Sequence, residues 1–305
     1  MRSEHSSTTS VSAVPRRTLR SLCYEAVRGV YSLLTHRVTD PLSRQRIRLC
    51  GVVWGYWPVL RMRRLDLRRR FQLLRRFLRI DWNVVHGHSP SEIAQIALAI
   101  DRQSDGRPRQ FVEAGCWQGG SSAKFSILCR LYGYRLHIYD SFEGVGDLTP
   151  ADRAKEWDYE GQYAAPEATL LGNLDQYGER SVVSTHRGWF SETLARGNAP
   201  AEISMAYIDC DVAKGTRDAL AGVVPALSPD GIVFSQDFHI GPARALLTNA
   251  ATWSTFGVRQ VEVKQLGRRL AMVRCDRGLS RSPEIPRHQP PYRSPERRDG
   301  QERMK

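Results

Sequence analysis

Three apolar segments of this sequence end in aspartates, and acids in such positions can do chemistry. Asp140, Asp209 and Asp237 each follow a short run of apolar and β-branched or aromatic residues. If the runs are parallel strands, their carboxyl ends meet at one edge of the sheet, where open α/β sheets bind ligands. The alternative is that these acids only cap the helices that follow them. We favour a functional site, because two of the acid-tipped runs are expected to be neighbours.

Oxygen ligands converge at this expected edge. Asp209, Gln236 and Asp237 offer carboxylate and amide oxygens, which suit Mg²⁺ or a similar hard cation. Asp211 and His239 lie beside them in the sequence, and either could take a proton from a substrate. A lone loop histidine is more often neither a base nor a ligand, so these two candidates stay unranked.

A glycine turn follows the first apolar run. Residues 111–122 read Phe-Val-Glu-Ala-Gly-Cys-Trp-Gln-Gly-Gly-Ser-Ser, an order typical of a strand, a turn and a helix start. Glycines allow the backbone to approach a ligand closely, and we expect a cofactor to contact Glu113, Gly115, Gly119, Ser121 and Ser122. The spacing is not G-x-G-x-x-G, which makes an NAD site a poor fit.

Asp140 lies about 25 residues beyond the glycine turn, the length of one strand–helix–strand step. An acid at the tip of the second strand commonly binds the ribose hydroxyls of an adenosine cofactor. A carboxylate can accept both hydrogen bonds of a vicinal diol. Asp140, with Ser141 beside it, is therefore predicted to bind a nucleotide-type cofactor.

The periodicity predicts a doubly wound, mostly parallel α/β sheet flanked by helices. Ser89 with Glu92 forms a capping box for a helix that runs to about Ile100. The predicted strands are Gln110 to Ala114, Arg135 to Tyr139, Ser181 to Thr185, Ser204 to Ile208 and Gly231 to Ser235, with a closing hairpin of Val258 to Val263 and Arg269 to Arg274.

The charge divides the chain into four parts. The net charge is +13, and arginines crowd residues 16–80 and the last thirty residues. We expect disorder over 1–15, a basic helical extension over 16–84, one catalytic domain over 85–275 and a disordered Pro/Arg-rich tail over 276–305. The amphipathic stretch 61–79 is interpreted as a helix packed on the domain with a solvated basic face, although contact with nucleic acid or anionic membrane is the alternative.

The composition favours a cytoplasmic protein. The six cysteines form neither a CxxC pair nor a metal-type cluster, which indicates reduced thiols. No apolar run reaches the ~18 residues of a membrane span. The polar N-terminus lacks the apolar core of a secretory signal.

Several blocks, in order, resemble the macrocin O-methyltransferase (TylF-like) family. The resemblance covers about residues 110–245. Its blocks are the glycine turn 111–123, Asp140-Ser141-Phe142-Glu143-Gly144, Asn173-Leu174 with Tyr177-Gly178, Gly188-Trp189-Phe190 with Glu192-Thr193-Leu194, Ile208 to Asp211, Thr216 to Leu220, and Pro225 to Gly231 running into Gln236-Asp237.

The resemblance implies a class I methyltransferase fold, with a seven-stranded Rossmann-like sheet and S-adenosylmethionine (SAM) as methyl donor. It also implies methylation of a sugar hydroxyl with Mg²⁺, held by Asp209 and Asp237. Asp209 would contact the cofactor as well. Gln236 stands where the macrolide enzymes carry a second aspartate, so the resemblance leaves the metal affinity of this site open. Residues 212–215 stand where the family often has a Tyr-Glu-Ser segment, so the identity of the acceptor cannot be carried over directly.

Two further segments are candidates for binding. Gly188, Trp189 and Phe190 could flank an adenine, with core packing as the competing account. The long segment Asp147 to Asn173, with Trp157, Tyr159 and Tyr163, could close as a lid or be an ordinary insertion.

The expected partner is a small hydroxyl-bearing acceptor, such as a sugar-containing metabolite or glycan; peripheral contact with anionic membrane and a homo-oligomer are kept open. The rival function is a non-catalytic SAM-fold protein that binds nucleic acid or anionic membrane through its basic N-terminal region. Nucleic acid is disfavoured, because the acids at the sheet edge would repel phosphate.

Overall fold

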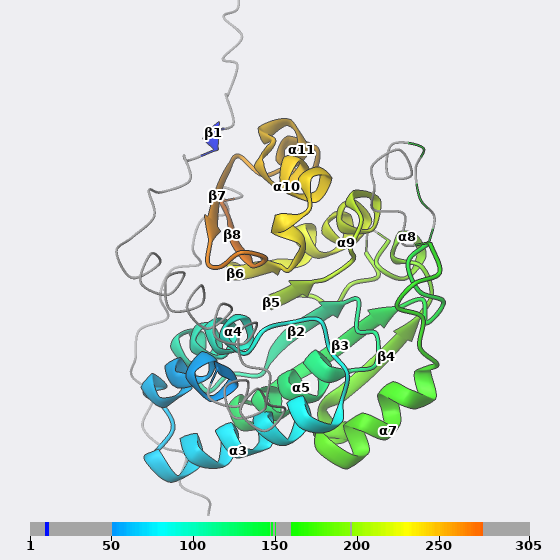
Figure 1. Ribbon diagram of the computed structural model, residues 1–305. Helices are drawn as coiled ribbons and strands as arrows, with labels where there is room; N and C mark the ends of the chain where they lie inside the picture. Colours follow the sequence, from blue (N-terminus) through cyan, green and yellow to red (C-terminus); the bar gives the residue numbers. More distant parts are fainter. Residues whose placement is uncertain are drawn as a thin grey trace, which may run out of the picture.

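The computed structural model describes residues 10–11, 51–146, 148, 150, 160–195 and 197–276. A mixed sheet runs through it in the order β1-β7-β8-β6-β5-β2-β3-β4 (Figure 1). Only β8 is antiparallel to its neighbours. The strands are β1 (Ser10–Val11), β2 (Arg109–Ala114), β3 (Tyr134–Asp140), β4 (Val183–Arg187), β5 (Ile203–Ile208), β6 (Leu227–Ser235), β7 (Gln260–Gln265) and β8 (Ala271–Asp276). The predicted parallel α/β architecture with a closing hairpin is therefore confirmed.

Helices cover both faces of the sheet (Figure 1). One layer contains α3 (Leu67–Asn83), α4 (Pro90–Gln103), α5 (Gly120–Tyr132) and α7 (Glu167–Tyr177). The other contains α8 (Phe190–Thr193), α9 (Ala213–Ala226), α10 (Gly241–Thr248) and α11 (Ala250–Thr255). Short 3-10 turns are η1 (Trp57–Arg61), η2 (Arg180–Val182) and η3 (Asp237–His239).

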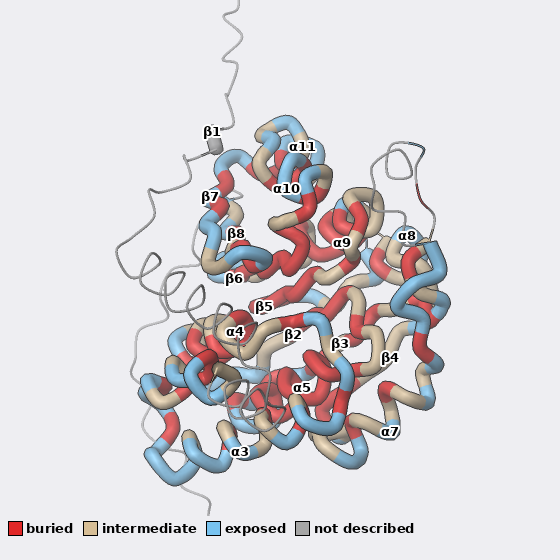
Figure 2. The backbone as a smooth tube through the Cα atoms, in the orientation of Figure 1, coloured by how far each residue is buried: buried red, intermediate tan, exposed pale blue. Residues whose placement is uncertain are grey.

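Successive side chains of the central strand β2 point to opposite faces of the sheet and enter two different hydrophobic cores. Phe111 packs into the core beneath α4 and α5, whereas Val112 belongs to the core beneath α9 and α10. Both side chains are fully buried, as expected for a strand covered on both faces. Figure 2 shows the buried strands as the red centre of the molecule.

The predicted capping box starts α4. The Ser89 side chain accepts a hydrogen bond from the Glu92 backbone N–H, and the Glu92 carboxylate accepts one from the Ser89 N–H at 2.7 Å. These two bonds satisfy orphan donors of the first turn. The helix ends at Gln103, three residues beyond the predicted end.

The described part of the basic extension packs on the domain. Leu73, Phe77 and Ile80 of α3 enter the same core as Phe111, so the interpretation as a packed helix is correct for this stretch. The predicted helix start at residue 61 is wrong. Asp66 caps the helix by accepting from the Arg69 N–H at 2.7 Å, so α3 begins at Leu67.

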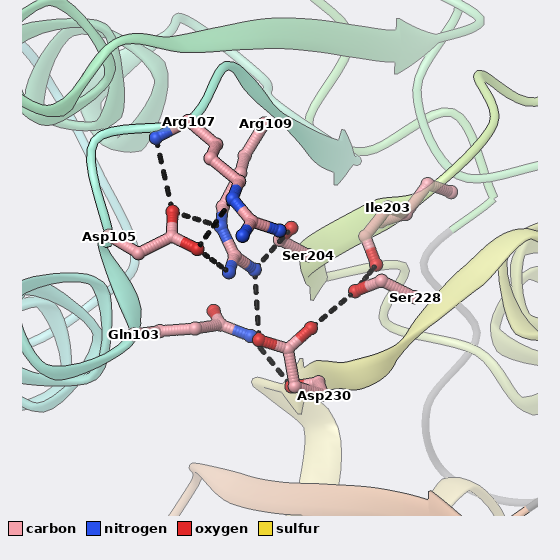
Figure 3. A network of polar contacts seen from close by, with 8 residues as sticks. All are labelled: Gln103, Asp105, Arg107, Arg109, Ile203, Ser204, Ser228 and Asp230. Atoms are coloured by element: carbon pink, nitrogen blue, oxygen red, sulfur yellow. Dashed lines mark hydrogen bonds and ion pairs between the residues drawn. The ribbon is translucent and has the colours of Figure 1, made fainter. Parts of the chain in front are cut away.

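Polar contacts tie together the amino ends of three strands, opposite the expected site (Figure 3). Arg109 of β2 donates to Asp230 in β6 at 2.9 Å, to Ser204 in β5 at 3.1 Å and to Asp105 at 3.1 Å. The Arg109 side chain is 14% exposed, whereas Asp105 and Asp230 are 37% and 53% exposed, so water screens these ion pairs on the side of the acids. This edge of the sheet is thus fixed, and the other edge is available for ligands.

Strand β4, predicted over Ser181 to Thr185, begins and ends two residues later, at Val183 and Arg187. Residues 180–182 form η2, and the ladder to β3 begins at Val183. Apart from β1 and Asp276, which ends β8, the segments predicted to be disordered lie outside the described residues, as do Asp147, Trp157 and Tyr159. No helix within the described ranges is long and apolar enough to cross a membrane.

Candidate active site

A cavity of about 310 Å³ opens at the carboxyl ends of the central strands. Most of the residues predicted for the site lie on its wall: Gly115, Ser121, Asp140, Ser141, Gly188, Trp189, Phe190, Asp209, Asp211, Gln236, Asp237 and His239. Glu113, Gly119 and Ser122 do not line it. Glu113 and Ser122 are fully buried, beneath the wall.

Three carboxylates come together in the cavity. Asp209 and Asp211 follow β5, Asp237 follows β6, and one oxygen of each lies within 4.8 Å of the others. β5 and β6 are parallel neighbours, with Ile208 opposite Ser235, so their next residues meet. Asp237 Oδ2 accepts from the Cys210 and Asp211 backbone N–H groups at 2.8 and 2.9 Å.

Burial and mutual repulsion disfavour full ionisation of this cluster. The pKa of Asp209 is raised well above its usual value by burial and by the charges of Asp237 and Asp211. Burial together with Asp211 raises the pKa of Asp237 to about 7, and burial raises that of Asp211 to about 6. A bound cation would relieve this repulsion.

The donor set fits a hard divalent cation. All three groups offer oxygen, and Asp237 Oδ1 is buried without a hydrogen-bond partner in the part of the chain that the structure describes. The expected ligand Gln236 is oriented by another contact: its amide Nε2 donates to Glu92 Oε2 at 3.3 Å. Its Oε1 is buried and has no partner among the described residues. Asp211, predicted only as a proton acceptor, is a member of the carboxylate cluster.

Non-glycine residues with positive φ gather at this edge of the sheet. Trp117 (φ 48°), Phe142 (φ 61°) and Asp211 (φ 60°) all follow strand ends and lie next to the cavity or on its wall. Such conformations cost energy and cluster where side chains must be aimed. They support a functional role for this edge.

The glycine turn is held by Asp140. The Asp140 carboxylate accepts from the backbone N–H groups of Cys116 (2.7 Å), Trp117 (3.3 Å) and Phe142 (2.7 Å). Three of roughly four acceptor positions are therefore used. Binding of both hydroxyls of a ribose by Asp140 stays a prediction, and it would require some of these contacts to be shared.

Glu113 supports the turn from beneath. It accepts from the Ser121 hydroxyl at 2.5 Å, and its other oxygen is buried without a partner among the described groups. Burial raises its pKa to about 8. The folded protein therefore holds Glu113 protonated at neutral pH, at a distance from the cavity surface.

The protonated Glu113 gives a pH test. Its folded pKa lies above its unfolded value, so its contribution to the free energy of unfolding falls as pH rises from about 4.5 to about 8. We expect Glu113→Gln, which mimics the protonated acid, to lose less stability than the wild type between pH 6 and pH 8. Thermal unfolding at both values measures this difference. Equal losses in the two proteins would contradict it.

Aromatic side chains border the cavity. The Trp189 ring covers Gly146 so closely that an added Cβ would lie 2.3 Å from it. Trp117 meets Tyr163 edge-on, with ring centroids 5.3 Å apart. Tyr163, in the segment predicted as a lid, therefore contacts the glycine turn. Whether Trp189 and Phe190 flank an adenine stays a prediction.

One wall of the cavity comes from the turn between α3 and α4, which sequence reasoning missed. Residues 85–88 line it, and His86 stacks on His88 at 4.3 Å. The fully buried Lys124 ammonium donates to His88 Nε2 at 2.6 Å and pairs with Asp81, which also contacts His86. The His-x-His pattern before the capping box was the available signal.

A second missed group is the hairpin tip between β7 and β8. Arg268 and Arg269 line the cavity, and Arg269 donates to the Gly87 carbonyl at 2.8 Å. Its charge lowers the pKa of Asp211 and Asp237 against the effect of burial. The hairpin was predicted, but nothing in its sequence indicated where its tip would fold.

Comparison with known proteins decides the family. The model of the family described as macrocin-O-methyltransferase (TylF) matches residues 90–252, more than half of the chain. The chain belongs to the macrocin O-methyltransferase family. The resemblance based on the sequence blocks is thereby confirmed.

Two curated relatives are named for the reactions that they catalyse. The chain is 32% identical over 150 residues to 8-demethyl-8-(2,3-dimethoxy-alpha-L-rhamnosyl)-tetracenomycin-C 4'-O-methyltransferase from Streptomyces olivaceus, covering 46% of this chain and 57% of that protein. It is 29% identical over 152 residues to mycinamicin III 3''-O-methyltransferase from Micromonospora griseorubida, covering 46% and 59%. The chain thus spans less than two thirds of the length of either relative.

Solved structures of O-methyltransferases share the fold. The O-methyltransferase NovP matches with a TM-score of 0.53 at 20% identity, over 61% of this chain and 81% of its own. The calicheamicin methyltransferase CalS11 matches with a TM-score of 0.50 at 20% identity, over 86% and 98%. The predicted class I methyltransferase fold of this family member is confirmed.

Proposed function

We propose that this chain transfers a methyl group from SAM to a hydroxyl group of a sugar-containing small molecule, with a divalent cation such as Mg²⁺. The observation that carries the proposal is the meeting of three carboxylates with the glycine turn in one cavity. Family membership and the sugar O-methylations named for the two relatives support it.

SAM supplies an electrophilic methyl group. The chain's own task is to hold that group and the acceptor in line, which can lower a barrier by about 7–11 kcal/mol. Gly115, Ser121, Asp140 and Ser141 line the cavity, which supports their assignment as cofactor-binding residues. Trp189 and Phe190 supply apolar surface on the same wall.

A divalent cation would lower the pKa of an acceptor hydroxyl and fix its position. Asp209, Asp211 and Asp237 are the residues that would hold it, with Gln236 Oε1 as a neutral donor. His239 also lies on the wall, and burial and Arg269 lower its pKa, so it is neutral at pH 7 and able to accept a proton.

The rival function, a non-catalytic protein that binds nucleic acid, is less well supported. Its phosphates would meet the buried carboxylates of the cavity, and the family and both relatives are named for methyl transfer. Calorimetric titration with SAM and S-adenosylhomocysteine, followed by transfer assays on rhamnose-bearing acceptors, tests the proposal. Micromolar binding and methylated product would support it; absence of cofactor binding would refute it.

The neutral donor at Gln236 predicts weak cation binding. We expect Gln236→Asp to raise the affinity for Mg²⁺ or Mn²⁺ about tenfold, because it restores a charge beside Asp237 despite the nearby Glu92. Calorimetry with the metal alone measures this. Gln236→Glu, which adds the charge on a longer side chain, is the control for position; unchanged affinity in Gln236→Asp would contradict the prediction.

A further inference from the structure

The outer face of α3 carries an apolar stripe in addition to the face that packs on the core. Leu67, Phe71 and Trp82 are 60%, 53% and 67% exposed, although each is large and apolar. At about 100° per residue, these three positions fall within about 60° of arc, and the half-buried Leu74 and Leu78, which also pack against the core, lie next to or between them. Clustered exposed apolar side chains mark interaction sites.

The stripe is rigidly presented. The opposite side of α3 is anchored in the core by Leu73, Phe77 and Ile80, all at most 2% exposed. Figure 2 shows α3 at the periphery, with exposed and half-buried stretches along its outer side. Two exposed tryptophans, Trp54 and Trp57, stack on each other shortly before the helix.

Arginines border the stripe. α3 holds six arginines and a single acid, Asp81, which is committed to Lys124. Arg68 and Arg75 lie next to the stripe on the helical wheel, are exposed, and have no ion-pair partner within the described ranges. Arg79 lies over the Tyr177 ring. An apolar stripe beside unneutralised cations fits a surface that is both apolar and anionic.

The charges argue against two other occupants. Residues 1–50 contain nine arginines and three acids, and the sequence after residue 276 is also basic, so either terminal segment would be repelled by α3. A second copy related by a two-fold axis would bring two arginine rows together. Nucleic acid has the right charge, but it offers no apolar partner for the exposed aliphatic side chain of Leu67.

We propose that the outer face of α3 docks on an anionic lipid bilayer, with its apolar stripe in the interface and Arg68 and Arg75 on the headgroups. Three residues after Trp82, the exposed Val85 reaches the wall of the cavity. Docking would therefore hold the cavity wall close to the membrane surface. The proposal is independent of the reaction proposed above.

The test is sedimentation of the full chain with vesicles of phosphatidylcholine alone or mixed with phosphatidylglycerol. We expect binding only to the anionic vesicles, weakening with salt. Phe71→Ser with Trp82→Ser should lower the partition coefficient at least tenfold, and Arg68→Gln and Arg75→Gln about fivefold each. Leu131→Ser and Arg107→Gln, which change exposed residues outside α3, are the matched controls and should bind as the wild type does.

Three outcomes would overturn the proposal. The first is no binding to anionic vesicles. The second is equal binding by the wild type and the stripe variants, which would assign the contact to other arginines. The third is a dimer in solution that the stripe variants convert to monomer without any vesicle binding, which would make the stripe a contact between copies. Because all the replaced side chains are exposed, we expect each variant to fold as the wild type does. Circular dichroism checks this.

Discussion

Asp237→Asn is expected to lower kcat for methyl transfer about 10²- to 10³-fold, the usual cost of removing one preorganised electrostatic group. The amide keeps an oxygen for the Cys210 and Asp211 backbone N–H groups, so the loop between β5 and its helix should persist. What is lost is a negative charge of the carboxylate cluster. Affinity for S-adenosylhomocysteine should change less than threefold, while cation binding should be lost.

Steady-state kinetics and calorimetry on the same preparation separate these effects. Asp175→Asn, an exposed acid on α7, is the control for a lost surface charge and should leave kcat unchanged. If Asp237→Asn retained full kcat, the carboxylate cluster would have no part in the reaction. If Asp237→Asn lowered both kcat and the affinity for S-adenosylhomocysteine, the role of Asp237 would be to maintain the structure of the site.

Gly115→Ala is expected to lower the free energy of unfolding by about 3 kcal/mol or more and to abolish cofactor binding. Its φ of +87° disfavours a side chain by about 1–2 kcal/mol. An added Cβ would also lie only 1.9 Å from the Asp209 carbonyl oxygen, so β2 and β5 would have to part at the cavity, a strain of about 1–3 kcal/mol.

Gly133→Ala is the matched control. Gly133 has a φ of +75°, but an added Cβ there meets nothing within 4 Å. It should cost only the backbone term, about 1–2 kcal/mol, and leave cofactor affinity intact. Urea unfolding and calorimetry measure both quantities. Equal destabilisation in the two variants would show that the approach of Gly115 to β5 carries no strain.

The strand pattern and the acids at strand ends could be predicted from the sequence because both follow from local periodicity. Asp209 and Asp237 are fixed as neighbours once β5 and β6 are parallel and adjacent. The contact between Gln236 and Glu92 could not be predicted, since it joins residues 144 positions apart through the packing of α4. The same holds for the proximity of Arg269 to Gly87, which depends on how the hairpin tip folds over the turn.

The predicted first residues of α3 and β4 were wrong for a similar reason. Residues 61–66 and 181–182 have apolar periodicity that suits a helix or a strand, but capping by Asp66 and the turn η2 decide where each element begins. The sequence also did not indicate that Asp140 holds the glycine turn in addition to its predicted role in cofactor binding. Its acid type suggested a ligand, whereas three backbone donors that hold the glycine turn become visible only in three dimensions.

The wall formed by residues 85–88 has a consequence for the modular make-up of this protein. The family match begins at residue 90, yet the cavity is closed by a turn that precedes it and by Arg268 and Arg269, which follow the end of the match at residue 252. The segment that matches the family model therefore supplies the floor of the site, and the residues before and after it supply its rim. A change in the turn before residue 90 or in the hairpin tip would therefore alter the entrance of the cavity while leaving the strand ends beneath it in place.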